Sequence, residues 1–356
     1  MSTIVLMVNS ITELGGAARV AHTLAGGFTE RGHRVVLIGL ERAHEPRDLD
    51  PQARYARATL LDHPLPPAAQ EEARAEAEAV IGDALRRLLA SLEPGVIITT
   101  QVWCKEMLDR VPHAEWTVIG QYHSSFEAAV HSGDIDRLLA SYADTRFVTM
   151  LTQADALAMR DRGLARSVAM PNPVAFWPQV LASGDDRVVT YLGRLSPEKA
   201  PDLLAEAWHL VAARHPEWRL QFVGSGPMAD AIAGRELPRC EVLPPTDDPA
   251  DVLLHSGVLA LPSLVEGFPL SLLEAMACGV PAVAADSSAG VRALVEDGRT
   301  GILTVRGDEQ DLAEGLDRLL GDADLRRSMA AHARSQARGY RLPVVLDRWE
   351  DLLASL

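Results

Sequence analysis

The chain has 356 residues, enough for two domains of ordinary size, and its 47% hydrophobic and 23% charged residues are typical of a globular protein. A formal net charge of −15 argues against broad binding to nucleic acid or to an anionic membrane, because both need a basic surface. Three cysteines, Cys104, Cys240 and Cys278, form no CxxC pair, so the sequence indicates neither a zinc site nor a disulfide framework.

The first residues read as a buried strand, because they carry neither a basic leader nor a small-residue cleavage site. No run of about twenty apolar residues follows anywhere in the sequence, so no membrane-spanning helix is expected. We therefore predict a cytoplasmic protein. Peripheral contact with a membrane through a local basic patch stays open.

Short β-branched runs alternate with helix-period segments along the first half of the chain, the pattern of parallel sheets built from βαβ units. An irregular stretch and a long Ala/Glu/Arg-rich helix at about 68–92 separate the second and third strands. The expected strands are Ile4–Val8, Arg34–Gly39, Val96–Thr100, Thr117–Gln121, Arg146–Met150 and Ser167–Met170.

The segment Met170–Val174 breaks this alternation with two prolines, and we expect the domain boundary near Val174. A second alternating series follows, and an amphipathic helix at Val344–Leu356 ends the chain. The expected strands of the second series are Val188–Leu192, Leu220–Val223, Glu241–Leu243, Val258–Leu261 and Pro281–Ala285.

The pattern therefore predicts two doubly wound α/β domains, residues 1–174 and 175–339. In two such domains facing one another, ligands bind in a cleft at the carboxyl ends of the strands.

The most informative segment runs from Glu266 to Pro281 and holds two carboxylates, Glu266 and Glu274, with seven residues between them. A Gly-Phe-Pro turn and a helix start lie between the two, and we expect Pro269 in the first helical turn, where its missing N–H is no loss. Free N–H groups at a helix start hold anions, while carboxylates accept hydrogen bonds from hydroxyls. A ligand with both phosphate and hydroxyl groups, such as a nucleotide sugar, fits this combination.

This segment resembles the E-x7-E signature of the large retaining glycosyltransferase family called GT4 or glycosyl transferases group 1. The resemblance implies that Glu266 lies beside the donor sugar and that Glu274 binds the ribose hydroxyls. It assigns backbone contacts with the sugar and diphosphate to the intervening turn, Gly267, Phe268, Pro269 and Leu270. It also implies the two-Rossmann-domain GT-B fold, in which the final helix, residues 340–356, crosses back to the first domain.

Simpler interpretations exist for both acids. Ser271 to Glu274 has the spacing of a capping box, in which Glu274 only closes a helix start. Glu266 alone could be a solvated loop residue. The length of the match and the further motifs below favour the functional interpretation.

A second motif, from Tyr191 to Lys199, follows a predicted strand and opens a helix. Arg194 can bind a phosphate with its planar fork, and Lys199 adds a compact charge. A departing diphosphate needs such cations when no metal ion is present. The resembled family uses its Gly-Arg…Lys pattern in this way. The alternative is that both cations form ordinary ion pairs with Glu198 or Asp202.

Two candidates lie in the first half of the chain. Gly16, in the glycine pair between the first strand and the first helix, could let the backbone approach a phosphate or sugar. It could equally mark a tight connection. His123 follows the strand that ends near Gln121, and the resemblance places a histidine of this loop close to the donor sugar. A lone histidine is otherwise more often structural.

Two weaker matches lie in the second half. Gly224 follows a strand in a Val-Gly-Ser-Gly-Pro loop that resembles the family's diphosphate loop. Thr246 lies in a segment that resembles the family's contact with the nucleotide base. Asp247 and Asp248 in the same turn are interpreted as a helix start rather than as metal ligands.

The chain departs from the family pattern after Asp286, where Ala289 stands for a usual Gly and Ala293 for a usual Glu. Any contact that the family makes at these two positions is therefore in doubt, and sugar choice could differ. The resemblance is convincing over about residues 190–305 and patchy in the first domain.

Together these features predict a retaining hexosyltransferase that uses a nucleoside-diphosphate sugar, with a UDP-sugar favoured, and that needs no cofactor or metal. The resemblance implies same-face substitution, in which the leaving phosphate takes the proton of the acceptor. The expected catalytic residues are His123, Arg194, Lys199 and Glu266. Alternatives are a sugar-nucleotide epimerase, a phosphorylase, for which no pyridoxal phosphate lysine is marked, and an inactive nucleotide-sugar-binding scaffold.

The acceptor is left open. Residues 121–125 and 151–155 look somewhat like bacterial enzymes that decorate teichoic-acid-type polymers. A natural product, a lipid-linked intermediate or a small polyol fits nearly as well. The Ala- and Arg-rich composition suggests a bacterial source.

Overall fold

The structure is a computed structural model that describes residues 2–356. Contacts divide the chain into two compact units. The first unit contains Met1–Ala175 and Leu342–Leu356, and the second unit contains Phe176–Arg341. Within residues 2–356, no helix combines the length and the apolar character needed to cross a bilayer.

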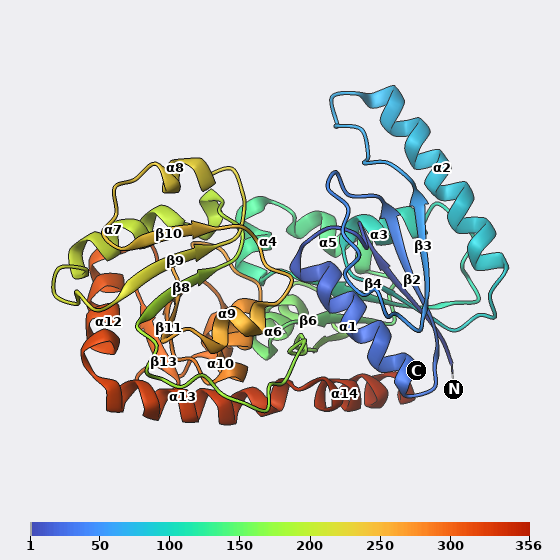
Figure 1. Cartoon of the computed structure of the whole chain (residues 1–356). Helices are drawn as coiled ribbons and strands as arrows, with labels where there is room; N and C mark the ends of the chain where they lie inside the picture. Colours follow the sequence, from blue (N-terminus) through green and yellow to red (C-terminus); the bar gives the residue numbers. More distant parts are fainter. Residues whose placement is uncertain (1) are drawn as a thin grey trace. The chain divides into compact units, whose positions relative to one another are not determined.

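The first unit is built on a parallel sheet (Figure 1). Among the described residues it has seven strands in the order β3-β2-β1-β4-β5-β6-β7. This order and the parallel pairing of neighbouring strands define a Rossmann-type sheet. The strands are β1 Thr3–Val8, β2 Arg34–Glu41, β3 Ala56–Leu61, β4 Val96–Thr99, β5 Thr117–Tyr122, β6 Phe147–Met150 and β7 Ser167–Ala169.

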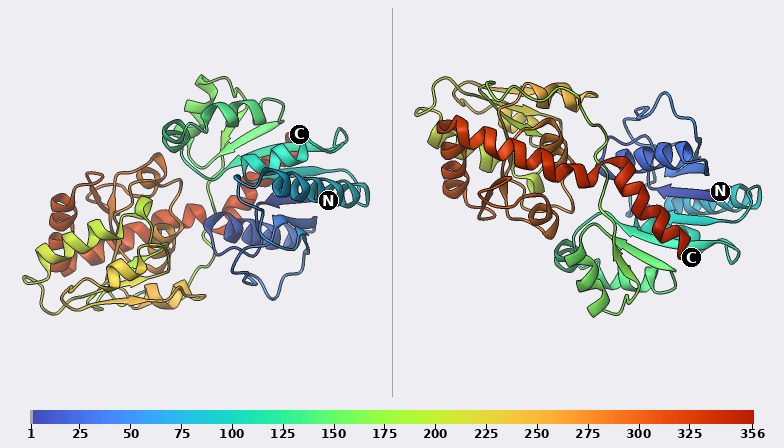
Figure 2. Two further views of the ribbon diagram at one scale, coloured as in Figure 1. Left: turned by 90° about the horizontal axis from the view of Figure 1, so that it is seen from above. Right: turned by 90° about the horizontal axis from the view of Figure 1, so that it is seen from below.

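Helices cover both faces of this sheet (Figure 1, Figure 2), so its central strands are apolar along their whole length. All six residues of β1 are buried, and Val5 and Met7 pack in one cluster with Ile81 and Leu85 of α2. The helices of this unit before its last one are α1 Gly16–Glu30, α2 Glu71–Ala90, α3 Val102–Leu108, α4 Phe126–Ser132, α5 Ile135–Tyr142 and α6 Gln153–Asp161.

The last helix of the chain, α14 (Leu342–Ala354), belongs to the first unit and packs against α1. Trp349 of α14 meets Phe28 of α1 edge-on, with ring centroids 6.1 Å apart. Asp347 forms a 2.6 Å ion pair with Arg31. The prediction that the final helix joins the first domain is confirmed.

The second unit repeats the architecture. Its described strands form a six-stranded sheet in the order β10-β9-β8-β11-β12-β13, again with parallel pairing of neighbours. The two α/β units with parallel sheets confirm the predicted fold class. The strands are β8 Val188–Leu192, β9 Arg219–Val223, β10 Cys240–Leu243, β11 Val258–Leu261, β12 Ala282–Ala285 and β13 Gly301–Thr304.

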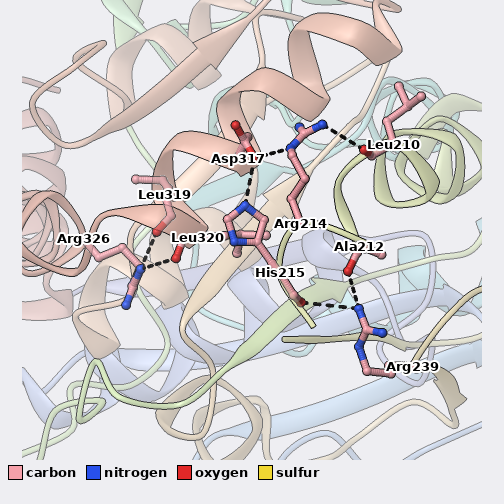
Figure 3. A network of polar contacts seen from close by, with 9 residues as sticks. All are labelled: Leu210, Ala212, Arg214, His215, Arg239, Asp317, Leu319, Leu320 and Arg326. Carbon is pink, nitrogen blue, oxygen red and sulfur yellow. Dashed lines mark hydrogen bonds and ion pairs between the residues drawn. The ribbon is translucent and has the colours of Figure 1, made fainter. Parts of the chain in front are cut away.

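Polar contacts join the helices of the second unit at their ends (Figure 3). Arg326, buried on α13, donates to the carbonyls of Leu319 and Leu320 and so satisfies the end of α12. Asp317 of α12 accepts from both Arg214 and His215 after α7. The helices are α7 Pro201–Val211, α8 Ala229–Ala233, α9 Pro249–Leu254, α10 Leu270–Cys278, α11 Ala289–Leu294, α12 Glu309–Gly321 and α13 Ala323–Ala337; the 3₁₀ turns are η1 Pro197–Lys199 and η2 Arg338–Tyr340.

Two strands were absent from the sequence prediction. Strand β3 lies in the stretch interpreted as irregular, and β13 follows the last predicted strand. Both lie at the edge of their sheet, where a strand pairs on one side only. Most of β3 is exposed or half-buried, so it lacks the apolar run of a central strand.

Candidate functional site

The two strongest sequence motifs meet in the second unit. The turn η1 ends the Tyr191–Lys199 motif, and the Glu198 carbonyl accepts hydrogen bonds from the backbone N–H groups of Leu264 (2.9 Å) and Val265 (3.2 Å). The residues that follow Glu198 and Val265 are also in contact, because the Lys199 ammonium lies 2.7 Å from the Glu266 carboxylate. The fold therefore brings a predicted cation and a predicted carboxylate together.

These two charges differ in exposure. The Glu266 side chain is 6% exposed and that of Lys199 is 29% exposed. A buried carboxylate needs a partner, and the ammonium supplies it. Burial, followed by the nearby Glu266 charge, raises the pKa of the Tyr191 phenol well above its usual value. The simple interpretation of Glu266 as a solvated loop residue is therefore wrong.

The loop that carries Arg194 is held by two glycines from the next loop. A Cβ atom at Gly224 would overlap the Gly193 carbonyl oxygen, and one at Gly226 would overlap the carbonyl oxygen of Leu195. The backbone N–H of Leu195 also donates to Ser225, at 2.8 Å. Gly224 thus supports the Tyr191–Lys199 motif by close backbone packing.

Arg194 lies at the tip of this loop and is exposed. Its carbonyl accepts a 2.5 Å hydrogen bond from the Tyr191 hydroxyl, which fixes the backbone and leaves the direction of the side chain open. Within residues 2–356 no ion pair holds the Arg194 guanidinium. Lys199 makes its ion pair with Glu266 and not with Glu198 or Asp202. Against the effect of burial, a hydrogen bond from Ser196 and then the charges of Arg194 and Lys199 lower the pKa of Glu198, so the alternative that these cations act on Glu198 is not overturned.

The Glu266 loop, residues 266–270, leads into α10. Pro269 is the residue before the helix, with φ −68° and ψ 110°, so it lies one position earlier than the first helical turn that the sequence predicts. Ser271 is inside the helix and cannot be its cap, so the capping-box interpretation is wrong. The first amides of α10, from Leu270 on, have no partner within the helix, as at any helix start.

Glu274 is buried in α10, with 2% of the residue exposed. Burial, with the Glu274 charge as a further cause, raises the pKa of the Cys278 thiol to about 12. A buried carboxylate one turn into a helix is a costly group, so its presence calls for hydrogen-bonding partners.

The short helix α11 packs directly on the Glu266 loop. A Cβ atom at Gly290 would overlap the Gly267 carbonyl oxygen and lie 3.0 Å from the Phe268 Cα. The Ser288 hydroxyl lies 3.4 Å from the same carbonyl. The two departures from the family pattern, Ala289 and Ala293, are both in this helix.

Thr246 lies between β10 and α9. Its hydroxyl accepts from the backbone N–H of Asp248 at 3.0 Å, and the Asp248 carboxylate accepts from the Asp251 N–H at 3.1 Å. Asp248 is the N-cap of α9, so the prediction that these acids form a helix start is confirmed. No group of three or more acids, cysteines or histidines within residues 2–356 has metal-binding geometry.

In the first unit, Gly16 begins α1 and is exposed at its start. The preceding loop is anchored by His22, whose ring nitrogens lie 2.9 Å from the Ile11 carbonyl and 2.6 Å from the Tyr55 hydroxyl. Tyr55 in turn donates to Asp50 at 2.8 Å. This loop therefore has a fixed path at the carboxyl end of β1.

His123 directly follows β5, at the carboxyl end of the strand. Its Nε2 atom is fully covered and has no hydrogen-bond partner within residues 2–356. Burial lowers the pKa of His123 to about 4, so the imidazole is neutral at pH 7. A charged His123 that stabilises phosphate, one of the two expected roles, is therefore disfavoured, and a neutral hydrogen-bonding role fits.

Asp155, in the second of the two segments that look like polymer-decorating enzymes (121–125 and 151–155), contacts Phe126, the residue directly after the first segment. This buried carboxylate accepts from the backbone N–H of Phe126 at 2.8 Å and from the Thr152 hydroxyl at 2.6 Å. The contact caps α4 and α6 at their starts, which is a structural role.

A cavity of about 360 Å³ lies at the amino ends of strands β1, β4 and β5 in the first sheet. None of the predicted site residues lines it. It is lined by residues at the amino ends of the strands, whereas ligands of such sheets bind at the carboxyl ends. We therefore do not assign it to the site.

Some residues of this arrangement were not predicted. Gly226 and Gly290 lie close to quoted motifs, and their spacing to the motif residues could have identified them. Tyr340, whose ring contacts Phe268 with centroids 5.4 Å apart, has no such signal, because it is a lone aromatic residue far along the chain.

Two Rossmann-type units, a last helix that returns to the first unit and the convergence of both motifs in the second define the GT-B fold class. Solved structures share it over the whole chain. HepE from Anabaena with UDP-glucose matches with a TM-score of 0.82 and 18% identity, covering 100% of both chains. S. aureus TarM with UDP, α-GlcNAc-glycerol and fondaparinux matches with a TM-score of 0.81 and 14% identity, covering 99% of this chain and 100% of that chain.

Residues 175–336 match the sequence model of glycosyl transferases group 1. A curated relative, an uncharacterized glycosyltransferase of Haemophilus influenzae, is 28% identical over 215 residues. The match covers 58% of this chain and 60% of the relative. The chain thus spans about three fifths of that protein's length.

Proposed function

We propose that the protein is a glycosyltransferase that moves a hexose from a nucleoside-diphosphate sugar to an acceptor hydroxyl. The contact that carries this proposal is the 2.7 Å approach of Lys199 to Glu266. It joins a cation that suits a diphosphate to a carboxylate that can accept hydrogen bonds from sugar hydroxyls. The family match of residues 175–336 and the UDP-glucose named for HepE support this choice and make UDP-sugars the first donors to test.

The proposed reaction retains the configuration at the anomeric carbon. The bond between that carbon and the diphosphate breaks, and the acceptor oxygen bonds on the same face of the sugar. The acceptor proton passes to the leaving diphosphate. Glu266 orients sugar hydroxyls rather than attacking, because its carboxylate is already engaged by Lys199.

Charge on the leaving group is the main demand of this reaction. We assign Arg194, Lys199 and the free amides at the start of α10 to the diphosphate, so that no metal ion is required. Backbone groups of Gly267, Phe268, Pro269 and Leu270 would contact the sugar and diphosphate, Gly224 the diphosphate, Thr246 the base and Glu274 the ribose. In the first unit, Gly16 and neutral His123 are assigned to the donor.

The acceptor proposed first is a hydroxyl of a polyol or a polyol-containing polymer. The likeness of residues 121–125 and 151–155 to polymer-decorating enzymes supports this class, as does the α-GlcNAc-glycerol named for TarM. We place the reaction in the bacterial cytoplasm, where the three free thiols of the chain would stay reduced.

The first experiment is a thermal-shift screen of UDP-, GDP- and ADP-sugars, because a ligand that prefers the folded state raises the melting temperature. Release of the nucleoside diphosphate with and without glycerol-type acceptors, in the presence of EDTA, then measures transfer. An epimerase would change the sugar without releasing diphosphate. A scaffold would bind the donor and leave it intact.

The roles of the cations are tested by replacing each separately with alanine. We expect K199A to lower the rate of diphosphate release by about 100-fold or more, since electrostatic stabilisers of a transition state typically contribute that much. R194A should have a similar but smaller effect, because its side chain is exposed. Rates within about twofold of wild type for both variants would contradict the assignment.

The matched control is R235A. Arg235 forms a 2.6 Å ion pair with Glu206 on the surface of the same unit. Its loss removes one positive charge without touching the motifs, so the rate should stay within about twofold of wild type. A comparable loss in R235A would mean that net charge, and not position, explains the effect.

A further inference from the structure

The Glu266 loop is supported from behind by α11. Gly290 approaches the loop so closely that a side chain at this position would overlap the Gly267 carbonyl oxygen. Ser288, the N-cap of α11, adds a contact of 3.4 Å from its hydroxyl to that oxygen. Because there is no space between them, a shift of α11 has to move Gly267 and Phe268 as well.

The other end of α11 is held by residues near the end of the second unit. The carbonyl of Ala293 accepts hydrogen bonds from the Gln336 amide at 2.9 Å and from the Tyr340 hydroxyl at 3.2 Å. The last carbonyls of a helix have no partner within it, so these two donors satisfy a group that would otherwise be unpaired. They also fix where α11 ends.

Tyr340 has a second contact, with the loop itself. Its ring lies 5.4 Å from the Phe268 ring, at an interplanar angle of 56°. Phe268 is 5% exposed, so this contact is part of the packing that orders the loop. Tyr340 therefore touches both the Glu266 loop and the helix that supports it.

We propose that Tyr340 is a positioning residue for donor binding: its ring sets Phe268, and its hydroxyl, with Gln336, sets α11 behind Gly267. The inference rests on the proposed function, because it assumes that the Glu266 loop binds the sugar and diphosphate. Backbone donors must be held within a fraction of an ångström to bind such a ligand well. Tyr340 acts through the loop and does not touch the donor.

The ring and the hydroxyl make different contributions. In Y340F the ring contact with Phe268 remains, and Gln336 still donates to Ala293. In Y340L the ring is lost. We expect Y340L to weaken donor binding about tenfold, a free-energy change of about 1.4 kcal/mol, and Y340F to stay within about twofold. The double variant Y340F/Q336L removes both hydrogen-bond donors to the Ala293 carbonyl. Its affinity for the donor sugar nucleotide should lie between those of Y340F and Y340L.

The experiment measures the dissociation constant of the wild type for the donor found in the thermal screen, with UDP-glucose as the first probe, and then those of the variants. The KM for donor and kcat are measured beside it, and we expect KM to change more than kcat. W349L is the control. Trp349 is a buried aromatic residue of α14 that packs on Phe28, and its loss should lower the melting temperature without the same change in donor affinity.

The results separate a failure of the proposed function from a failure of the role of Tyr340. If the wild type binds no nucleotide sugar, the proposed function fails and the role of Tyr340 fails with it. If the wild type binds and Y340L binds within about twofold as tightly, the role of Tyr340 alone is overturned. Should Y340L not fold, the graded series Y340F, Q336L and Y340F/Q336L decides, and equal donor affinity across that series would refute the positioning role.

Discussion

The two units hold their predicted site residues in different ways. In the second unit, Gly224 packs on Gly193, Gly290 packs on Gly267, and Lys199 contacts Glu266. In the first unit, a Cβ atom at Gly15, the neighbour of Gly16, would meet nothing within 4 Å. The buried Nε2 of His123 has no partner within residues 2–356.

This difference shows that a glycine in a motif can serve the packing of the protein or the binding of a ligand. The glycines of the second unit are required by the packing of the protein itself, so their replacement changes stability whether or not a ligand binds. Gly15 of the first unit has no such requirement, so its role can be tested only with ligand. His123 is the exception in the first unit, because its burial affects stability through its protonation.

The largest effect expected concerns His123 and pH. Its pKa is about 4 in the folded protein, below the ordinary value of 6.5, because burial disfavours the charged ring. Above pH 6.5 both folded and unfolded forms are neutral, so His123 gives no pH dependence. As the pH falls from 6.5 to 4, only the unfolded form takes up the proton, and stability falls by up to about 3 kcal/mol.

Urea unfolding of the wild type and of H123Q at pH 7 and pH 5 checks this prediction. Between these two values the wild type should lose about 2 kcal/mol more than H123Q. H332Q, which replaces an exposed histidine of α13, is the control variant. An identical loss in wild type and H123Q would show that His123 is accessible to protons in the folded state, and the contrast between the units would be weaker.

The next effect sharpens the contrast between glycines. G290A forces a methyl group against the Gly267 carbonyl, and we expect a cost of about 1–3 kcal/mol from overpacking. G82A makes the same change in α2 of the first unit, where nothing lies within 4 Å, and should stabilise that helix by up to about 1 kcal/mol. Melting temperatures should therefore move in opposite directions. A melting temperature of G290A equal to or above that of wild type would contradict the packing argument.

The smallest effect concerns the anchor of the loop before Gly16. Y55F removes the hydroxyl that lies between His22 and Asp50, and the loss of hydrogen bonding should cost about 1 kcal/mol. Urea unfolding measures the change. The variant also tests whether this anchor affects the loop, because donor affinity should fall if Gly16 contacts the donor. An unchanged free energy of unfolding would mean that water takes the place of the Tyr55 hydroxyl.

The fold was predictable where burial on both faces leaves an apolar run, as in Ile4–Val8 and Val258–Leu261. The edge strands β3 and β13 were missed, although the other two edge strands, β7 and β10, were predicted. Strand β3 has only Leu61 buried, and its sequence is therefore mostly polar or small. Periodicity carries information about burial, and a strand that is hardly buried carries little of it.

For the candidate site, the sequence predicted a set of residue types but not the contacts between them. The spacing of Glu266 and Glu274 identified the loop and helix, yet it gave no reason to pair Lys199 with Glu266 or to place Tyr340 against Phe268. Those contacts join residues far apart in the sequence, and they depend on the path of the chain between parallel strands. Pro269 shows the same limit locally, since its exact place at the helix start depends on the loop before it.

The membership of α14 in the first unit has a consequence for folding during synthesis. The second unit is one uninterrupted stretch, Phe176–Arg341, so all of its residues have left the ribosome before the first unit receives Leu342–Leu356. Until then Phe28 of α1 lacks its contact with Trp349, and Arg31, directly after α1, lacks its ion pair with Asp347. The unit that is translated first is thus completed last, and in the interval a nascent chain would present an apolar surface to chaperones.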